Sequence, residues 1–448
     1  MSNNSFRARD AACVWHPCTQ MKDHERYPPI PIARAEGVWL YDYDGRRYLD
    51  AISSWWVNLF GHANPRINAA LRAQLETLEH VIFAGFTHEP GVALAERLIA
   101  LAPAGLARVM YADSGSSAVE IALKMSFHYF RNTGQGERTR FVSLAGSYHG
   151  ETLGALSVGD VGLYKDVYAP LLLKNLIAPP PDAYQREPGE TPAQFAERSA
   201  AALHELLSHH ARDVCAVIVE PLVQCAAGMR MHDPVYLRRA REICDNFGVH
   251  LIADEIAVGM GRTGTLFACE QAGITPDFLL LGKGLTGGYL PLSAVLTSAD
   301  VYAAFYDDFE TRRAFLHSHS YAGNALGCRA ALATLDIFAD QPVLERNRQL
   351  GAYMESACAA LRDHPHVAEV RRSGMILAID LVQDRSTRTP FDWRERRGYR
   401  VYRYGLEHEV FLRPLGDVIY FMPPYVINEQ EIDLLARVAT NGIDRATQ

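Results

Sequence analysis

The chain has 448 residues, of which 48% are hydrophobic and 21% charged, and a net charge of −8. This composition is ordinary for a globular protein and supplies ample material for a large core. Because there is no polybasic segment, neither nucleic acid nor an anionic membrane is expected as a partner. The expected partner is a small molecule.

The first residues, MSNNSFRARDAACVWHP, lack the apolar core of a signal peptide, and no run of about 18 apolar residues indicates a membrane span. The eight cysteines are scattered and form no CxxC pair. In a chain this large they are expected to be reduced thiols. A soluble protein of the cytoplasm is the expectation.

Apolar runs of strand length alternate with helical patterns in the middle of the chain. The expected strands are 108–113, 140–146, 216–221, 250–255 and 277–282, and the clearest expected helices are 117–131 and 234–247. This alternation predicts an α/β fold with a largely parallel sheet, in which ligands collect at the carboxyl ends of the strands.

After about residue 335 the sequence pattern changes to one that predicts long helices and short alternating strands. We predict three segments: 1–75, which contributes to a small domain and to the active site, 76–335, which forms the large domain, and 336–448, which forms most of the small domain. Length alone also suggests two or three domains.

A lysine stands between two glycines in FLLLGKGLTGG, residues 278–288, directly after a run typical of a buried strand. A phosphate-binding P-loop is excluded, because Lys283 is followed by glycine and no glycine loop precedes it. Burial favours the neutral amine, whose lone pair can attack a carbonyl in Schiff-base chemistry. The alternative is a loop lysine that reaches solvent.

A carboxylate ends another apolar run in LIADEIAVGMGRTG, where Asp254 precedes Lys283 by 29 residues. That spacing fits one strand-crossover-strand unit, so both side chains are expected at neighbouring strand ends. Pyridoxal phosphate needs such a pair, a lysine for its aldehyde and a carboxylate for its ring nitrogen. Alone, Asp254 could simply cap a helix.

Two further stretches follow expected strands. In DSGSSAVEIALK, residues 113–124, Ser117 and Glu120 fit a capping box, and Gly115, Ser116 and Ser117 would present donors to a phosphate at the helix N-terminus. In GSYHGET, residues 146–152, Tyr148 and His149 are candidates to stack on a flat ring. The alternatives are a well-capped helix and an aromatic residue of a hairpin turn.

Together these motifs resemble the class III aminotransferases, pyridoxal-phosphate enzymes of fold type I, from HPCTQM at residue 16 to YFMPPY at residue 425. The resemblance implies a large domain with a mostly parallel sheet flanked by helices, and a smaller α+β domain built from the two chain ends. The catalytic residues it implies are Lys283, Asp254 and Tyr148. The cofactor-binding residues it implies are Gly115, Ser116, Ser117, Tyr148, His149, Asp254, Lys283 and Ser320.

Ser320, in HSHSYAGN, matches a phosphate contact made by the other subunit, so the resemblance implies a homodimer with shared sites. His317 and His319 have HxH spacing, but a metal site there is the less favoured interpretation, and no metal is expected.

Three stretches, DAISSWWVNLFGH, HPCTQM and FLRPLGDVIYFMPPY, resemble a biotin-pathway branch of the family that aminates 8-amino-7-oxononanoate with S-adenosylmethionine as donor. Trp55, Trp56 and Tyr148 can wall a slot for a long aliphatic chain, and Arg413 can clamp a terminal carboxylate. The remaining residues placed near the substrate by resemblance are Cys18, Arg262, Ser318 and Tyr420. Arg262 and Tyr420 could equally be structural.

Cys225 occupies the position five residues after Glu220, where many aminotransferases that use 2-oxoglutarate carry a second glutamate that pairs with the carboxylate-binding arginine. Arg413 should therefore stay available to bind the carboxylate of the substrate. The open alternatives are an ω-aminotransferase for 4-aminobutyrate or ornithine, lysine as donor because position 18 is the small Cys18, and a noncatalytic ligand sensor. In the favoured mechanism, ping-pong transamination, Lys283 acts as general base and then general acid.

Overall fold

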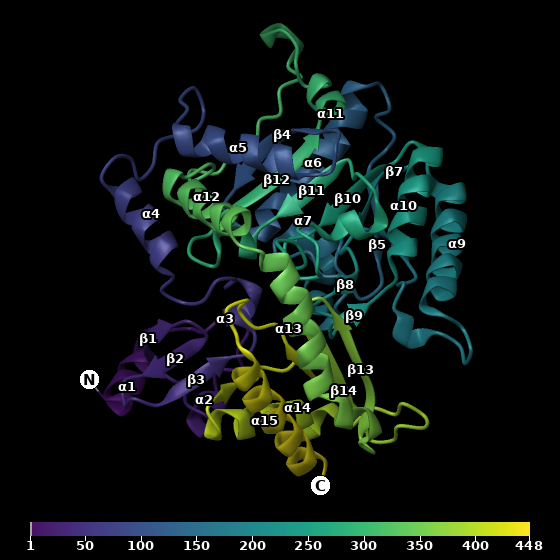
Figure 1. Ribbon diagram of the computed structural model, residues 1–448. Coiled ribbons are helices and arrows are strands. Elements are labelled where there is room, and N and C mark those ends of the chain that lie inside the picture. The colour runs from purple at the N-terminus through teal and green to yellow at the C-terminus, as the bar shows by residue number, and fades with distance from the viewer. Residues whose placement is uncertain (1) are drawn as a thin grey trace.

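The computed structural model describes residues 2–448, which form an α/β structure with a large upper part and a smaller lower part in the view of Figure 1. The upper part is built on a seven-stranded sheet, and the lower part on a four-stranded and a three-stranded sheet. The α/β class predicted from the sequence is confirmed.

The large sheet has the strand order β4-β12-β11-β10-β7-β5-β6. The strands are β4 (Leu106–Ala112), β5 (Arg140–Leu144), β6 (Leu176–Ala178), β7 (Val214–Val219), β10 (His250–Asp254), β11 (Phe278–Leu281) and β12 (Ser293–Ser298). Neighbours pair in parallel from β11 to β6, and β12 is antiparallel to β11 and β4. All five predicted strands are present, while β6 and β12 were not predicted.

Helices cover both faces of this sheet, as successive side chains of β11 show. Phe278 and Leu280 belong to a core cluster with α6 (Gly115–Asn132), whereas Leu279 and Leu281 belong to the larger cluster on the other face. That second cluster includes α5 (Glu89–Leu101), α9 (Pro192–His210), α10 (Pro234–Phe247) and α12 (Ala325–Asp340). Because each strand is buried on both sides, its sequence is apolar throughout rather than alternating.

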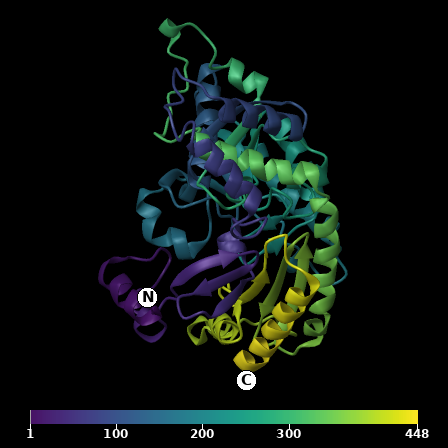
Figure 2. The same ribbon diagram turned by 60° about the vertical axis from the view of Figure 1, so that its left-hand side comes forward.

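The lower part joins the two ends of the chain. Its four-stranded sheet consists of β1 (Ile32–Glu36), β2 (Trp39–Asp42), β3 (Arg47–Asp50) and β15 (Val410–Phe411), with β15 parallel to β3. The three-stranded antiparallel sheet consists of β13 (Val367–Ser373), β14 (Ile376–Leu381) and β16 (Val418–Phe421). Figures 1 and 2 both show the N-terminal and C-terminal segments together here. We propose that 1–75 and 336–448 form the smaller domain and 76–335 the larger.

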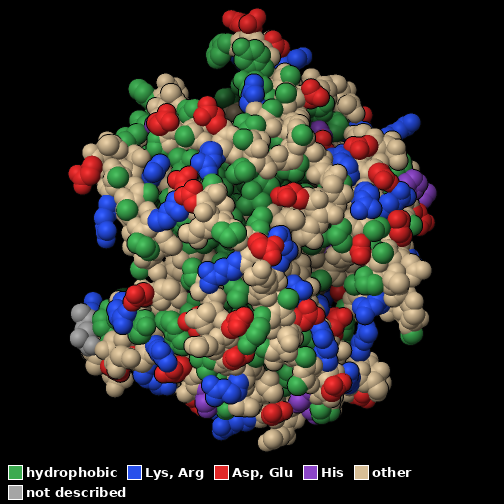
Figure 3. Space-filling model, viewed as in Figure 1, with side chains coloured by type: hydrophobic (Ala, Val, Ile, Leu, Met, Phe, Trp, Pro, Cys, Tyr) green, Lys and Arg blue, Asp and Glu red, His purple; other side chains and the backbone are tan. Residues whose placement is uncertain are grey.

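Helices of the lower part are α1 (Asn3–Cys13), α13 (Val343–Ala357), α14 (Arg397–Glu407) and α15 (Glu429–Thr447), and α4 (Pro65–Leu75) leads into the upper part. No helix within residues 2–448 is long and apolar enough to cross a membrane. Acidic and basic side chains are interspersed over the face seen in Figure 3, as the small net charge of −8 leads one to expect.

Candidate active site

The carboxyl ends of the parallel strands place the candidate residues at one edge of the large sheet. Asp254 is the last residue of β10, and Lys283 follows β11 by two residues. The two strands are neighbours, with Asp254 opposite Leu280 in the parallel register. The prediction that the carboxylate and the lysine lie at adjacent strand ends is therefore confirmed.

Lys283 begins a short 3-10 turn with a backbone φ of +41°, a conformation that residues other than glycine rarely adopt. Its Nζ lies 5.0 Å from the centroid of the Trp56 ring. Desolvation by the surrounding protein lowers the pKa of the Lys283 amine, and the negative charge of Asp254 opposes that shift. This environment favours the neutral, nucleophilic form of the amine.

Asp254 is almost fully buried and is oriented by two hydrogen-bond donors. His149 Nδ1 lies 2.7 Å from Asp254 Oδ2, and the backbone N–H of Ile256 donates to Oδ1 at 3.1 Å. His149 Nε2 is also buried, and no atom of residues 2–448 satisfies it. His149, expected from the sequence to stack on a ring, therefore holds the carboxylate in place in this structure.

The N-terminus of α6 differs in detail from the prediction. Its N-cap is Ser114, whose Oγ accepts from the N–H of Ser117, so the capping box of Ser117 and Glu120 is wrong. Glu120 instead accepts the backbone N–H groups of Gly154 and Ala155. The helix starts two residues before the predicted boundary because Ser114 is also a good cap.

The predicted phosphate residues Gly115, Ser116 and Ser117 form the first turn of α6. The first N–H groups of a helix have no partner within it and attract anions. Ser116 Oγ accepts the N–H of Glu151, and a Cβ on Gly150, whose φ is +123°, would lie 2.1 Å from that oxygen. Glycine is thus required where this loop crosses the helix end.

Tyr148 lies on the same loop and is held at both ends. Its backbone N–H donates to Glu220 Oε2 at 2.9 Å, and its hydroxyl donates to Glu151 Oε1 at 2.9 Å. Glu220 Oε1 accepts the N–H of Cys225 at 3.0 Å, and burial raises the pKa of Glu220 to about 7. Glu220 therefore joins two loops at the sheet edge, a role that the sequence analysis missed.

The two tryptophans come from α3 (Ser53–Trp56), which is a left-handed turn with φ values of +53°, +47°, +71° and +73°. Such a turn costs roughly 1–2 kcal/mol per residue. Asp50 stabilises it by accepting the N–H and hydroxyl of Ser54 at 2.9 and 2.6 Å. Strain retained in this way is typical of functional sites.

The turn sends the tryptophan side chains to different environments. Trp56 is buried, and its Nε1 donates to the hydroxyl of Tyr420 on β16 at 3.0 Å. Trp55 is 40% exposed, and the Arg413 guanidinium lies 5.1 Å from its ring centroid. Because Trp56 also flanks Lys283, the structure brings the tryptophans, Tyr420 and Arg413 to the lysine side of the site.

Arg262, which the resemblance places near the substrate, is held by contacts with the backbone. It is 1% exposed, and its guanidinium donates to four backbone carbonyls: Pro423 at 2.8 Å, Asn58 at 2.9 Å, Trp56 at 3.3 Å and Met422 at 3.4 Å. These carbonyls belong to the segments that carry Trp56 and follow β16. The geometry supports a structural role that fixes the two segments together.

Ser318 and Ser320 are both exposed to solvent. The neighbouring histidines bind different partners: His317 Nδ1 lies 2.8 Å from Lys124 Nζ, and His319 Nδ1 lies 2.9 Å from Asp113 Oδ1. The HxH pair is therefore engaged in separate contacts, which gives the metal alternative no support.

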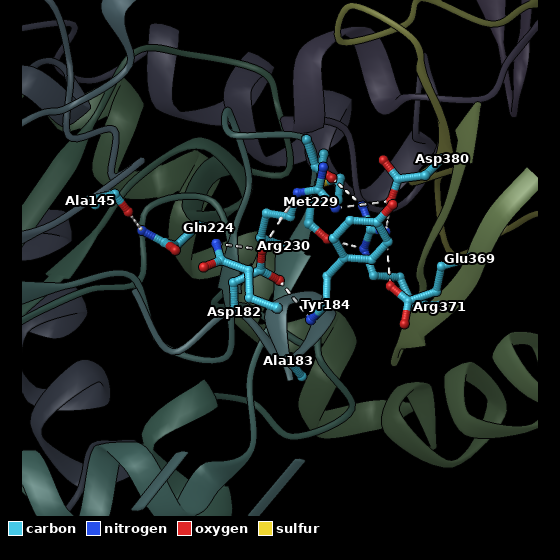
Figure 4. A network of polar contacts seen from close by, with 12 residues as sticks. Ala145, Asp182, Ala183, Tyr184, Gln224, Met229, Arg230, Glu369, Arg371 and Asp380 are labelled. Atoms are coloured by element: carbon cyan, nitrogen blue, oxygen red, sulfur yellow. Dashed lines mark hydrogen bonds and ion pairs between the residues drawn. The ribbon is translucent and has the colours of Figure 1, made fainter. Parts of the chain in front are cut away.

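A partly buried polar network ties the turn beside Cys225 to the three-stranded sheet (Figure 4). Asp380 on β14 accepts from Arg371 on β13 and from Arg230 Nη1 at 3.0 Å. Arg371 Nε in turn donates to the carbonyl of Met229 at 2.7 Å, in the turn between β8 (Val223–Gln224) and β9 (Arg230–Met231). The turn beside Cys225 is thereby tied to the sheet that carries Tyr420.

The chain belongs to the class III aminotransferase family, whose model matches residues 20–441. It is 44% identical to an adenosylmethionine-8-amino-7-oxononanoate aminotransferase of Geobacter sulfurreducens, covering 99% of this chain and 98% of the relative. Identity to the protein of that name from Helicobacter pylori is 46%, with 96% and 95% covered.

Solved structures of class III transaminases have the same fold as this chain. The enzyme of the same name from Methanocaldococcus jannaschii superposes with a TM-score of 0.94 at 38% identity, covering 99% of this chain and 100% of that one. An ω-transaminase from Pseudomonas jessenii in complex with PMP has a TM-score of 0.94 at 30% identity, covering 99% and 98%. The resemblance to fold type I enzymes is confirmed.

Class III aminotransferases depend on pyridoxal 5′-phosphate, and the residues present here fit it. The amine of Lys283, the carboxylate of Asp254 and the donor-rich first turn of α6 are of the kinds that could hold its aldehyde, ring nitrogen and phosphate, respectively. The unsatisfied Nε2 of His149 leaves a buried polar atom for a group that the chain does not provide.

Proposed function

We propose that the chain transfers an amino group from S-adenosylmethionine to 8-amino-7-oxononanoate, giving 7,8-diaminononanoate in biotin synthesis. The observation that carries this proposal is the state of Arg413, which lies over the Trp55 ring. Among residues 2–448 no carboxylate pairs with Arg413, and Cys225 stands where a switching glutamate would. A permanent carboxylate receptor beside an aromatic wall suits a keto acid with a long apolar chain. Relatives that carry this activity in their names support it.

In this proposal the amine of Lys283 would hold the cofactor, and it would act as general base and then general acid toward the proton of the substrate carbon. Asp254 would keep the cofactor's ring nitrogen protonated, and Tyr148 would supply an aromatic face for the ring. When bound, pyridoxal phosphate supplies an electron sink for the bonding electrons left when the substrate carbon loses its proton. Tyr148 and the two tryptophans would supply apolar surface for the aliphatic chain of the substrate.

The experiment is a set of separate half-reactions. The cofactor-loaded enzyme is mixed with S-adenosylmethionine, lysine, 4-aminobutyrate or ornithine, and the pyridoxamine form is followed by absorbance before 8-amino-7-oxononanoate is added. Conversion by S-adenosylmethionine, followed by formation of 7,8-diaminononanoate, is expected. Conversion by lysine alone would change the donor and keep the acceptor.

Amination of other carbonyls but not of 8-amino-7-oxononanoate would favour the ω-aminotransferase alternative, to which the fold of the Pseudomonas jessenii enzyme lends support. An enzyme whose absorbance is unaffected by every donor would point to a ligand sensor.

Replacement of Arg413 by alanine should raise KM for 8-amino-7-oxononanoate. A hydrogen-bonded pair with a charged group contributes about 2 to 3 kcal/mol, which corresponds to roughly 30- to 150-fold in KM. The donor half-reaction should suffer less. Steady-state kinetics measures both, with the exposed Arg385→Ala as control. Equal damage to both half-reactions would show that Arg413 is structural.

We propose that the enzyme is a homodimer of the cytoplasm. Ser320 is exposed, and so are large apolar side chains near it in sequence, Phe309 at 93% and Leu316 at 90%. If these side chains form one contiguous apolar patch, such a patch is typical of an interaction surface. Eight free cysteines suit a reducing compartment. Sedimentation equilibrium should give twice the chain mass of 49.8 kDa, and a monomer would contradict a shared site.

A further inference from the structure

A tyrosine that the sequence analysis did not single out lies at the candidate substrate site. Tyr164 is in the short helix α8 (Gly162–Lys165), and its hydroxyl is 3.9 Å from the Sγ of Cys18. Its ring centroid lies 5.5 Å from that of Tyr148, at an interplanar angle of 63°. Tyr164 thus contacts two residues of the predicted site, although 146 residues separate it from Cys18.

The orientation of Tyr164 differs from that of its neighbours. Leu163 and Val167 are each 84% exposed, whereas Tyr164 is half-buried against Tyr148. Lys165 fixes the segment, because its Nζ donates to the carbonyl of Gly159 at 2.7 Å and lies 3.8 Å from Asp160 Oδ1. The phenol is therefore held toward the site rather than toward solvent.

The hydroxyl of Tyr164 is a hydrogen-bond donor without a strong protein acceptor. Burial raises the pKa of Tyr164 to about 12, so the phenol stays protonated at neutral pH, and the positive charge of Arg413 reaches it and opposes the shift. Among residues 2–448 its one hydrogen-bond partner is the Cys18 thiol, which is a weak acceptor. The nearby carboxylate of Glu151 accepts from the hydroxyl of Tyr148 instead.

We propose that Tyr164 is a substrate-binding residue whose hydroxyl donates a hydrogen bond to the substrate carboxylate that Arg413 receives. The assignment rests on the proposed function, which gives Arg413 that carboxylate. An O–H donor and a guanidinium can bind one carboxylate together, because it has lone pairs for both. The contacts of Tyr164 with Cys18 and Tyr148 place it among the residues predicted to bind that substrate. Cys18, being small, leaves room for the phenol, whose hydroxyl lies 3.9 Å from the Cys18 Sγ.

The test compares a charged with a neutral probe. Binding of nonanoate and of nonanamide to the cofactor-loaded enzyme is measured by calorimetry for the wild type and for Tyr164→Phe, which keeps the ring. Loss of a hydrogen bond to a charged group should weaken nonanoate binding by about tenfold and leave nonanamide binding within about twofold. KM for 8-amino-7-oxononanoate should rise by the same factor.

Two controls make the result specific. Tyr168→Phe, in the same segment with a 49% exposed side chain, should change neither affinity. Cys18→Tyr in the Tyr164→Phe background places a hydroxyl next to the lost one and should recover nonanoate binding.

Unchanged nonanoate binding in Tyr164→Phe would overturn the proposal, and equal weakening of both probes would assign Tyr164 to packing alone. A wild-type enzyme that binds nonanoate with this pattern but does not aminate 8-amino-7-oxononanoate would refute the proposed function and leave the role of Tyr164 standing.

Discussion

Replacement of Lys283 by alanine is expected to abolish transamination. General acid–base catalysis alone contributes about 10²- to 10⁴-fold, and this variant also loses the covalent hold on the cofactor, so a fall in kcat of about 10⁴-fold or more is expected. Among the residues described around the site, Lys283 is the amine that desolvation pushes toward its neutral form while Asp254 remains close enough to act on it.

The position of Lys283 explains why no other residue should replace its amine in the reaction. Its backbone is held at a φ of +41° between Gly282 and Gly284, where added Cβ atoms would come within 3.2 Å of Ile256 and 3.1 Å of Leu59. The close packing of the flanking glycines fixes the root of the side chain, while the four-carbon stem leaves the amine free to move.

Two measurements check this prediction. Turnover is followed directly, and covalent attachment is tested by borohydride reduction and peptide mass analysis, which should place the cofactor on the peptide containing Lys283 in the wild type and on none in the variant. Lys174→Ala, at an exposed lysine, should behave as the wild type. Near-native turnover by Lys283→Ala would remove the lysine from the mechanism.

Much of the large sheet could be predicted because its strands are buried on both faces. β7, β10 and β11 consist of fully buried residues, and such strands read as uninterrupted apolar runs. The positions of Asp254 and Lys283 follow from where those runs stop. β12 escaped prediction although it too is apolar, because an antiparallel strand directly after a turn interrupts the expected strand–helix alternation.

The parts that could not be predicted depend on contacts between distant segments. The left-handed turn at Ser53–Trp56 contains no glycine or asparagine that would suggest it, and it is held partly by Ser53 Oγ donating to the carbonyl of Met422, 369 residues away. Arg262 is placed near the substrate by resemblance only, and the backbone carbonyls that it binds lie at least 160 residues away in the sequence.

The second large effect is expected for Asp254→Asn. The variant keeps the shape of the side chain and an oxygen that can accept the N–H of Ile256, so the fold should persist. It loses the negative charge that would keep the cofactor's ring nitrogen protonated. Removing one preorganised group that stabilises developing charge costs at least about 100-fold in kcat, and cofactor content should remain near that of the wild type.

The pH dependence of the same variant separates an electrostatic role from a structural one. The carboxylate of Asp254 acts to raise the pKa of Lys283, against desolvation, which lowers it. Without the carboxylate the Lys283 pKa should fall further, so the neutral amine should persist to lower pH, and the acid limb of borohydride-trapped attachment should move to lower pH. Asp300→Asn, at an exposed carboxylate, should leave that profile unchanged. Normal turnover with an unshifted pH profile would show that Asp254 only anchors the Ile256 N–H and His149. Slow turnover with an unshifted profile would show that the charge of Asp254 acts on the cofactor and not on Lys283.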